Sequence, residues 1–145
     1  MKQLIKNLQG FSLIELLVVI SIIGILSSFG IVALNDSRLK ARDAKRKTDA
    51  SQVFLALQIY YDNEKVYPLC LCDGGEPTIN CWTVDLTAAL SPAAPARPYI
   101  LPMPEDPVNN VARDLVYKYC SDTGREFFIQ YRLELDDSIV VLRGL

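Results

Sequence analysis

The longest hydrophobic segment of the chain runs from residue 11 to residue 34 and carries one charged side chain, Glu15. Leu, Ile and Val dominate its 24 residues. An α-helix rises about 1.5 Å per residue, so this segment would be ~36 Å long, enough to cross a bilayer core of about 30 Å. The pattern therefore predicts one membrane-spanning helix over residues 11–34.

Helical spacing of apolar residues continues beyond this segment. No proline interrupts the chain between residues 11 and 66, and from residue 50 the apolar side chains recur on one helical face. Pro68 follows Tyr67 and ends the pattern. We therefore predict one long helix over residues 11–65, with a membrane half and then an amphipathic half. The apolar face of the second half comprises Val53, Phe54, Leu57, Tyr60 and Tyr61.

Residues 66–145 predict a small globular head. All eight prolines fall between residues 68 and 107, so this segment is expected to be a proline-rich loop with a short helix over 84–90. Alternating apolar residues then predict antiparallel strands over 117–120, 127–135 and 139–142. Three strands with one apolar face need a packing partner, which the amphipathic half of the helix supplies. The expected fold class is α+β, a long helix packed against a small antiparallel sheet.

Composition narrows the range of functions. The chain has a formal net charge of −2 and no histidine, and so lacks the commonest general base and metal ligand. It also lacks a nucleophile paired with a base, a glycine-rich phosphate loop and a metal-binding motif. We therefore expect neither enzymatic activity nor a cofactor. The mildly acidic balance also makes nucleic acid an unlikely partner.

The segment before the membrane helix is short, polar and basic. A secretory signal peptide places its apolar region before the cleavage site, whereas residues 1–10 precede the apolar region here. A cut between Gly10 and Phe11 would create an α-amino group four residues from Glu15. A charged side chain in a membrane helix costs about 2.5–3.5 kcal/mol at the centre, so such an amine, of the same or a neighbouring copy, is a suitable partner. The alternative is a plain signal anchor with Glu15 at the membrane surface.

Gly10-Phe11-Ser12-Leu13-Ile14-Glu15, together with the apolar run, resembles the N-terminal signature of type IV pilins and the pseudopilins of type II secretion systems. The resemblance implies a pilin-like fold and a leader peptide over residues 1–10. It implies cleavage between Gly10 and Phe11 by a prepilin peptidase and N-methylation of Phe11. It also implies that Glu15 pairs with the N-terminal amine of an adjacent subunit during assembly.

The same resemblance implies a function and a location. We expect a structural subunit of a helical, homo-oligomeric pilus-like filament, built with an inner-membrane assembly platform. Before assembly the subunit would sit in the lipid of the cytoplasmic membrane as a single-pass protein with its head outside. Two alternatives stay open. The first is a major pseudopilin of type II secretion, since residues 104–107 resemble the Pro-x-Asp-Pro segment of those proteins. The second is a minor tip pilin that binds DNA or a surface. A third is an anchored domain that never polymerises.

Charge around the predicted membrane helix opposes this orientation. Two lysines precede the helix and six cations follow it, which by the positive-inside rule favours a cytoplasmic head. The leader signature and the later cysteines favour the outward orientation instead. We expect the following cations to form a solvated or lipid-facing collar: Arg38, Lys40, Arg42, Lys45, Arg46 and Lys47.

Four cysteines permit three full pairings. Pairing Cys70 with Cys72 is sterically poor, so Cys81 and Cys120 are each expected to bind one of them, in either combination. Outside the cytoplasm two disulfides are the expected state, with free thiols or a Cys₄ zinc site as alternatives. Some members of the resembled family bind calcium in their C-terminal loops. The corresponding oxygens here, in Glu134, Asp136, Asp137 and Ser138, are interpreted as a turn, and no metal site is predicted.

Overall fold

The computed structural model describes residues 10–73, 76–93 and 97–145, and only the backbone of residues 28–33. The chain divides into two compact units, with the boundary in the sequence between Ser37 and Arg38. The first unit contains the beginning of one long helix, and the second contains the rest of that helix and the head.

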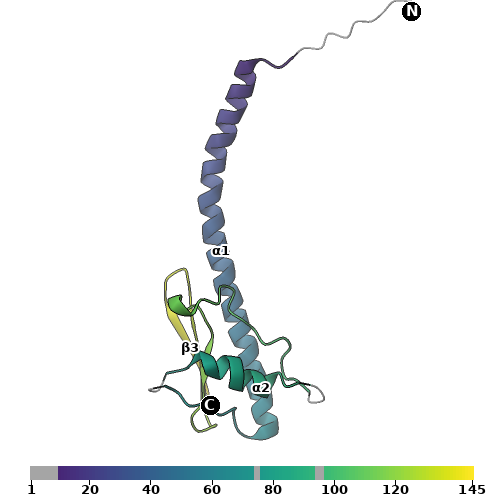
Figure 1. Ribbon diagram of the computed structural model, residues 1–145, viewed down its shortest axis with the longest axis vertical. Coiled ribbons are helices and arrows are strands. Elements are labelled where there is room, and N and C mark those ends of the chain that lie inside the picture. The colour runs from purple at the N-terminus through teal and green to yellow at the C-terminus, as the bar shows by residue number, and fades with distance from the viewer. Residues whose placement is uncertain (1–9, 74–75, 94–96) are drawn as a thin grey trace, which may run out of the picture. The chain divides into compact units, whose positions relative to one another are not determined.

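Helix α1 spans Leu13–Glu64 without interruption (Figure 1). It confirms the long N-terminal helix of the predicted fold class, and its continuity follows from the absence of proline. At its C-terminal end Lys65 adopts a left-handed conformation with φ 60°, and its N–H donates to the carbonyl oxygen of Tyr61 at 2.8 Å. This bond satisfies one of the last carbonyl groups of the helix.

Three antiparallel strands form the sheet of the second unit, in the order β1-β2-β3. They are β1 (Lys118–Cys120), β2 (Phe127–Arg132) and β3 (Ile139–Gly144). Ile129 of β2 lies opposite Tyr119 of β1 and Leu142 of β3, which sets the register. The α+β class and the three antiparallel strands predicted from the sequence are confirmed.

The second strand ends earlier than its alternating pattern predicts. The alternation places Leu133 and Leu135 on the buried face, but β2 ends at Arg132 and Leu135 is 54% exposed. The backbone N–H groups of Glu134 and Leu135 donate to the two carboxylate oxygens of Asp43, at 2.9 and 3.0 Å. These amides therefore bind a helix side chain instead of extending the sheet.

The core lies between the second half of α1 and the sheet. Val53 and Leu57 of α1 and Phe127 and Ile129 of β2 are fully buried in one cluster, and the rings of Phe54 and Phe127 are 5.2 Å apart. Burying such side chains contributes about 1.5–3 kcal/mol each. The amphipathic half of the helix is thus the partner that the three strands require.

Helical turns in the proline-rich segment cover another part of this core. A π-helical segment, η1 (Cys81–Leu86), runs directly into the short helix α2 (Thr87–Leu90), so helical structure begins earlier than the predicted residue 84. A 3₁₀ turn, η2 (Val111–Arg113), follows before the sheet. Trp82, Leu86 and Leu90 are buried, and the Trp82 indole N–H donates to the Pro104 carbonyl oxygen at 3.1 Å.

Candidate functional site

Ser12 and Glu15 form hydrogen bonds at the N-terminal end of α1. The backbone N–H of Ser12 donates to Oε2 of Glu15 at 2.9 Å, and the N–H of Leu16 donates to the Ser12 carbonyl oxygen at 3.2 Å. Ser12 is therefore the N-cap, and Glu15 satisfies a backbone donor that the helix leaves open. A carboxylate in the first turn also interacts favourably with the helix dipole.

Sequence reasoning missed the local role of Ser12, although its signal was present. Ser12-Leu13-Ile14-Glu15 fits the capping-box pattern, in which Ser or Thr precedes an acidic residue by three positions. Glu15 thus has a second use as a capping group besides its charge in the predicted membrane helix. Within the described residues Glu15 Oε1 accepts no hydrogen bond, so one oxygen of this carboxylate is available to a further donor.

The predicted cleavage site lies outside the helix. Gly10 and Phe11 precede the first helical residue, Phe11 is 89% exposed, and no atom lies close to the Cα of Gly10 on the side where a Cβ would stand. A peptide bond in non-helical, exposed backbone is the form that a protease can bind. Residues 1–9 of the predicted leader lie outside the described residues.

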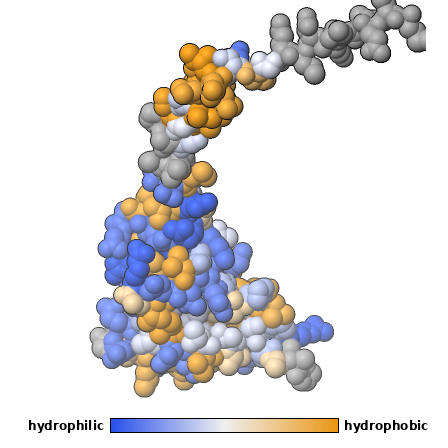
Figure 2. All heavy atoms as spheres, turned by 45° about the horizontal axis from the view of Figure 1, so that its top comes forward, coloured by the Kyte–Doolittle hydropathy of each residue, from blue (hydrophilic) through white to orange (hydrophobic). Residues whose placement is uncertain are grey.

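Apolar side chains cover most of the surface of the first part of α1, residues 13–27 (Figure 2). From Leu13 to Leu26 the large apolar side chains are between 47% and 84% exposed. Phe11, Ile14, Val18 and Val19 form a shallow apolar groove with Glu15 on its wall. Ser21 and Ser27 donate their hydroxyl hydrogens to carbonyl oxygens of the same helix, at 2.7 Å to Leu17 and Ile23. This surface is suited to burial against lipid or against apolar helices.

No helix in the part of the chain that the structure describes combines the length and the hydropathy of a membrane span. Side chains of residues 28–33 fall outside that part. The span over residues 11–34 stays a prediction.

The cations after residue 37 do not form one solvated collar, contrary to the expectation from sequence. Arg46 is fully buried and Arg42 is half-buried, whereas Arg38, Lys40, Lys45 and Lys47 are exposed. Arg46 donates to Asp106 through Nε at 2.6 Å and through a terminal nitrogen at 2.9 Å. It also binds Asp43 at 2.8 Å and Glu134 at 2.7 Å. We call Arg42, Asp43, Arg46, Asp106 and Glu134 the Arg46 cluster.

The Arg46 cluster joins three segments of the head. Asp43 and Arg46 come from α1, Asp106 from the proline-rich loop and Glu134 from the turn after β2. Arg42 binds Glu134 through two hydrogen bonds of 2.7 Å. Those bonds, with a further contribution from Arg46, lower the pKa of Glu134 to about 2. Burial opposes the charge of Arg46, but its hydrogen bonds to Asp106, Glu134 and Asp43 outweigh burial and raise its pKa.

A helical signal for the buried position of Arg46 was present in the sequence. Residues 43, 46, 50, 53 and 57 recur every three or four positions, so Asp43 and Arg46 extend the apolar face that continues through Val53. Asp49 lies beside that face and accepts a hydrogen bond of 2.8 Å from the buried hydroxyl of Tyr117. Burial next to this carboxylate raises the pKa of Tyr117.

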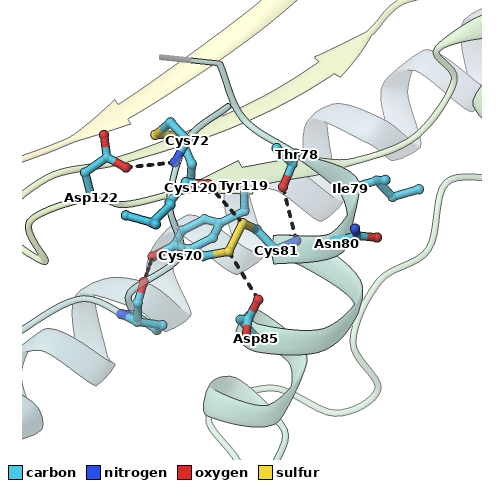
Figure 3. Close-up of a disulfide and its surroundings, with 12 residues drawn as sticks. Cys70, Cys72, Thr78, Ile79, Asn80, Cys81, Asp85, Tyr119, Cys120 and Asp122 are labelled. Atoms are coloured by element: carbon cyan, nitrogen blue, oxygen red, sulfur yellow. Dashed lines mark hydrogen bonds between the residues drawn. A yellow bond between two sulfur atoms is a disulfide. The ribbon is translucent and has the colours of Figure 1, made fainter. Parts of the chain in front are cut away.

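Two disulfides tie the proline-rich segment together and to the sheet, and Figure 3 shows the one between Cys70 and Cys81. Cys70 is joined to Cys81, and Cys72 to Cys120 of β1. This is one of the two combinations that the sequence left open, and no cysteine remains free to serve as a zinc ligand. The Cys72 N–H donates to Asp122 at 2.7 Å, and Asp85 Oδ2 lies 3.1 Å from the sulfur of Cys70.

Each of the residues considered for calcium contacts another group of the chain. Glu134 binds the two arginines, Asp137 binds Arg132 at 3.1 Å, and Asp136 accepts hydrogen bonds from Ser138. Their arrangement is that of a turn held by ion pairs and hydrogen bonds.

Comparison with known proteins gives two matches. Residues 5–31 match the family model described as "Prokaryotic N-terminal methylation motif". Over 68 residues the chain is 40% identical to "Type II secretion system core protein G" of Vibrio cholerae, an alignment that covers 47% of this chain and 46% of the relative. The chain thus spans about half the length of the curated relative it matches. No solved structure matches the chain.

Proposed function

Because this chain belongs to the family of type IV pilins and type II secretion pseudopilins, we propose that it is a structural subunit of a pilus-like filament. The observation that carries the proposal is the geometry at Glu15. This carboxylate is the one charge in the apolar segment 11–34, and it lines the same groove as Phe11, the residue after the proposed cleavage site. The family is one of structural subunits, so the chain is not an enzyme.

Processing is the first step of the proposed function. A prepilin peptidase cuts between Gly10 and Phe11, removes residues 1–10 and leaves Phe11 as an N-terminus that is then methylated. The exposed, non-helical backbone at this bond supports the proposal. The match to the methylation motif covers the same residues.

Assembly follows from the apolar surface of α1. Helices of neighbouring copies bury the exposed side chains of Leu13 to Leu26 against one another, which supplies cohesion. Oε1 of Glu15 pairs with the Phe11 α-amino group of an adjacent copy, while Oε2 continues to accept the hydrogen bond from the Ser12 N–H. Because a charge in an apolar filament core needs a partner, this pair would set the register between subunits.

The proposed location is the cytoplasmic membrane, with one span and the head outside, and then the filament. Two disulfides in the head support an oxidising compartment. The proposed partners are other copies of this chain, the peptidase, an inner-membrane assembly platform and, before assembly, membrane lipid.

A major pseudopilin of type II secretion is the second candidate. The similarity to core protein G favours it, as does the segment Pro104-Glu105-Asp106-Pro107. In this chain Asp106 of that segment binds Arg46, so the segment has a structural role in the head. The minor tip pilin that binds DNA or a surface has less support, since two of its six proposed cations are occupied by internal ion pairs.

Intact-mass analysis tests the processing step. Coexpression with a prepilin peptidase should yield a protein that begins at Phe11 and carries one added methyl group, whereas coexpression with an inactive peptidase should leave Met1 in place. A mature protein that still begins at Met1 in the presence of the active enzyme would contradict the proposal.

Substitution of Glu15 tests the assembly step. Glu15→Ala should leave membrane insertion and cleavage intact and lower the yield of filaments. Glu15→Gln keeps an oxygen for the Ser12 N–H but loses the charge, so it separates capping from pairing. We expect the yield of filaments to fall in both variants. A normal yield in Glu15→Gln alone would assign the effect of Glu15→Ala to the loss of capping. A normal yield in both variants would exclude the proposed pair of Glu15 and the Phe11 amine.

A further inference from the structure

A shallow apolar groove opens between α1 and β3 in the head. It is lined by Ser51, Phe54, Leu55 and Leu142, none of them charged, and Leu55 is 61% exposed. We call it the α1–β3 groove. The Ser51 hydroxyl donates to the Lys47 carbonyl oxygen at 2.8 Å, so its hydrogen is satisfied within the helix. The groove is therefore suited to an aliphatic side chain from another molecule.

A leucine of the proline-rich loop protrudes from the same head. Leu101 is 70% exposed, yet the loop on both sides of it is anchored. Tyr99 packs against Tyr60 of α1, with ring centroids 5.2 Å apart, and the Pro104 carbonyl oxygen accepts the hydrogen bond from the Trp82 indole. An exposed side chain on an anchored loop loses little conformational freedom when a contact buries it.

The loop that carries Leu101 runs along α1 in the opposite direction. It begins at the contact of Tyr99 with Tyr60 and reaches the ion pair of Asp106 with Arg46. The helix rises ~21 Å between these two contacts, a length that about seven nearly extended loop residues cover. Each loop residue thus passes about two helix residues, which places Leu101 roughly level with position 56 of α1.

The α1–β3 groove lies at a similar height on the other side of the helix. Its α1 residues are within about one turn of the level of Leu101, an offset of ~5 Å. The α1 residues that line a groove with the loop are Lys45, Asp49 and Gln52. Successive helix residues are rotated by about 100°, so the buried face that contains Val53 separates these residues from the α1–β3 groove.

We propose that Leu101 of one copy inserts into the α1–β3 groove of a neighbouring parallel copy. This inference rests on the proposed filament function. Subunits that leave one membrane have parallel helices, and an apolar projection and an apolar groove at nearly the same height then meet when two copies lie side by side. The match of the two surfaces of one chain favours a second copy as the occupant.

This contact can repeat along a filament. Each copy gives Leu101 to one neighbour and its groove to another, so the contact is heterologous. The two neighbours occupy opposite sides of α1 and therefore do not overlap. The axial offset of ~5 Å between the projection and the groove allows successive copies to rise instead of lying in a flat ring.

Charged groups beside the two surfaces are mixed in sign. Lys45 lines a groove with Asp49 and Glu105 on the side of the loop. Lys47 precedes the α1–β3 groove along α1, and Asp136 lies within the range of its charge. Because each side carries both signs, the proposed contact depends on shape and apolar burial instead of on net charge.

Charge placed in the contact tests it in the full-length processed protein. Leu101→Lys should lower the sedimentable filament fraction by about tenfold or more, because it buries an ammonium group without a partner. Leu55→Glu should do the same, and the double variant should restore filaments because the two charges then meet. Val111→Lys changes a side chain that is 63% exposed outside the contact, so it is the matched control and should assemble normally.

Cysteine cross-linking tests the contact without a new charge. Leu101→Cys and Ser51→Cys are made in separate copies with different tags, and mixed filaments are oxidised with copper phenanthroline in air. A disulfide between positions 101 and 51 that joins the two tags must link two copies, and we expect it in the filaments. The pair Leu101→Cys and Val111→Cys is the control and should not cross-link.

The outcomes separate this contact from the filament function. Normal assembly of Leu101→Lys, failure of the double variant to recover, or absence of the link between positions 101 and 51 would overturn the contact and leave the filament function intact. Absence of filaments from the wild-type chain would overturn the filament function, and the contact with it.

Discussion

The guanidinium of Arg46 binds the carboxylate of Asp106, 60 residues further along the chain, through two hydrogen bonds of 2.6 and 2.9 Å. Both side chains are almost fully buried, with exposures of 0% and 1%. This pair fastens the proline-rich loop to α1. Glu134 and Asp43 meet the same guanidinium, so one side chain holds together segments that no regular secondary structure connects.

Removal of the Arg46 side chain should destabilise the head strongly. Arg46→Ala would leave the buried carboxylates of Asp43 and Asp106 without their cation, a change that costs about 3–5 kcal/mol. Arg46→Lys keeps the charge but cannot donate in two directions to Asp106, so it should lie between wild type and Arg46→Ala. Urea unfolding in detergent, followed by circular dichroism, measures the difference. Arg113→Ala, at an exposed position, is the control, and equal stability of Arg46→Ala and wild type would contradict this role.

Stability should fall with acid because of Glu134. Its pKa is about 2 in the folded chain and 4.5 as a free side chain, so its stabilisation is fully present above pH ~5 and is lost as pH falls towards 2. This separation corresponds to about 3 kcal/mol. Unfolding measured between pH 7 and pH 3 should show the loss in wild type. Glu134→Gln should be less stable at pH 7 and less dependent on pH, and an unchanged pH profile in that variant would assign the dependence to other carboxyl groups.

The two disulfides should contribute unequally. Cys72–Cys120 closes a sequence separation of 48 residues and Cys70–Cys81 one of 11. In the chain-entropy description the longer loop contributes about 1 kcal/mol more, within a range of about 2–5 kcal/mol for each bond. Unfolding of the variants Cys72→Ser/Cys120→Ser and Cys70→Ser/Cys81→Ser compares them, and peptide mapping without reduction checks the pairing. A larger loss in the second variant would show that local packing outweighs loop length.

Gly144 should resist replacement by alanine. A Cβ at this position in β3 would overlap the ring of Phe127, which is fully buried in the neighbouring strand. Displacing a core aromatic ring costs about 1–3 kcal/mol. Thermal unfolding of Gly144→Ala measures this loss, with Arg143→Ala, an exposed neighbour, as the control. Equal melting temperatures of Gly144→Ala and Arg143→Ala would show that β3 can move away from Phe127 without loss of stability.

The sequence by itself determined the long helix, the three strands and the candidate processing site. These features depend on short-range patterns: helical periodicity without proline, alternation of apolar residues, and Gly10-Phe11 with Glu15 before an apolar run. The helix that begins at Leu13 and the burial of Phe127, Ile129 and Tyr131 on one face of β2 agree with those patterns.

Only the tertiary structure decided where Arg46 and the cysteines bind, and where β2 ends. A run of cations is expected to be solvated when only the sequence is known. Here the carboxylates of Asp106 and Glu134, from distant segments, bind Arg46 and bury it. The choice between Cys81 and Cys120 as the partner of Cys70 likewise depended on which loops lie side by side. The spacing of residues along the chain does not determine such long-range contacts, because they follow from packing the helix, the loop and the sheet around one core.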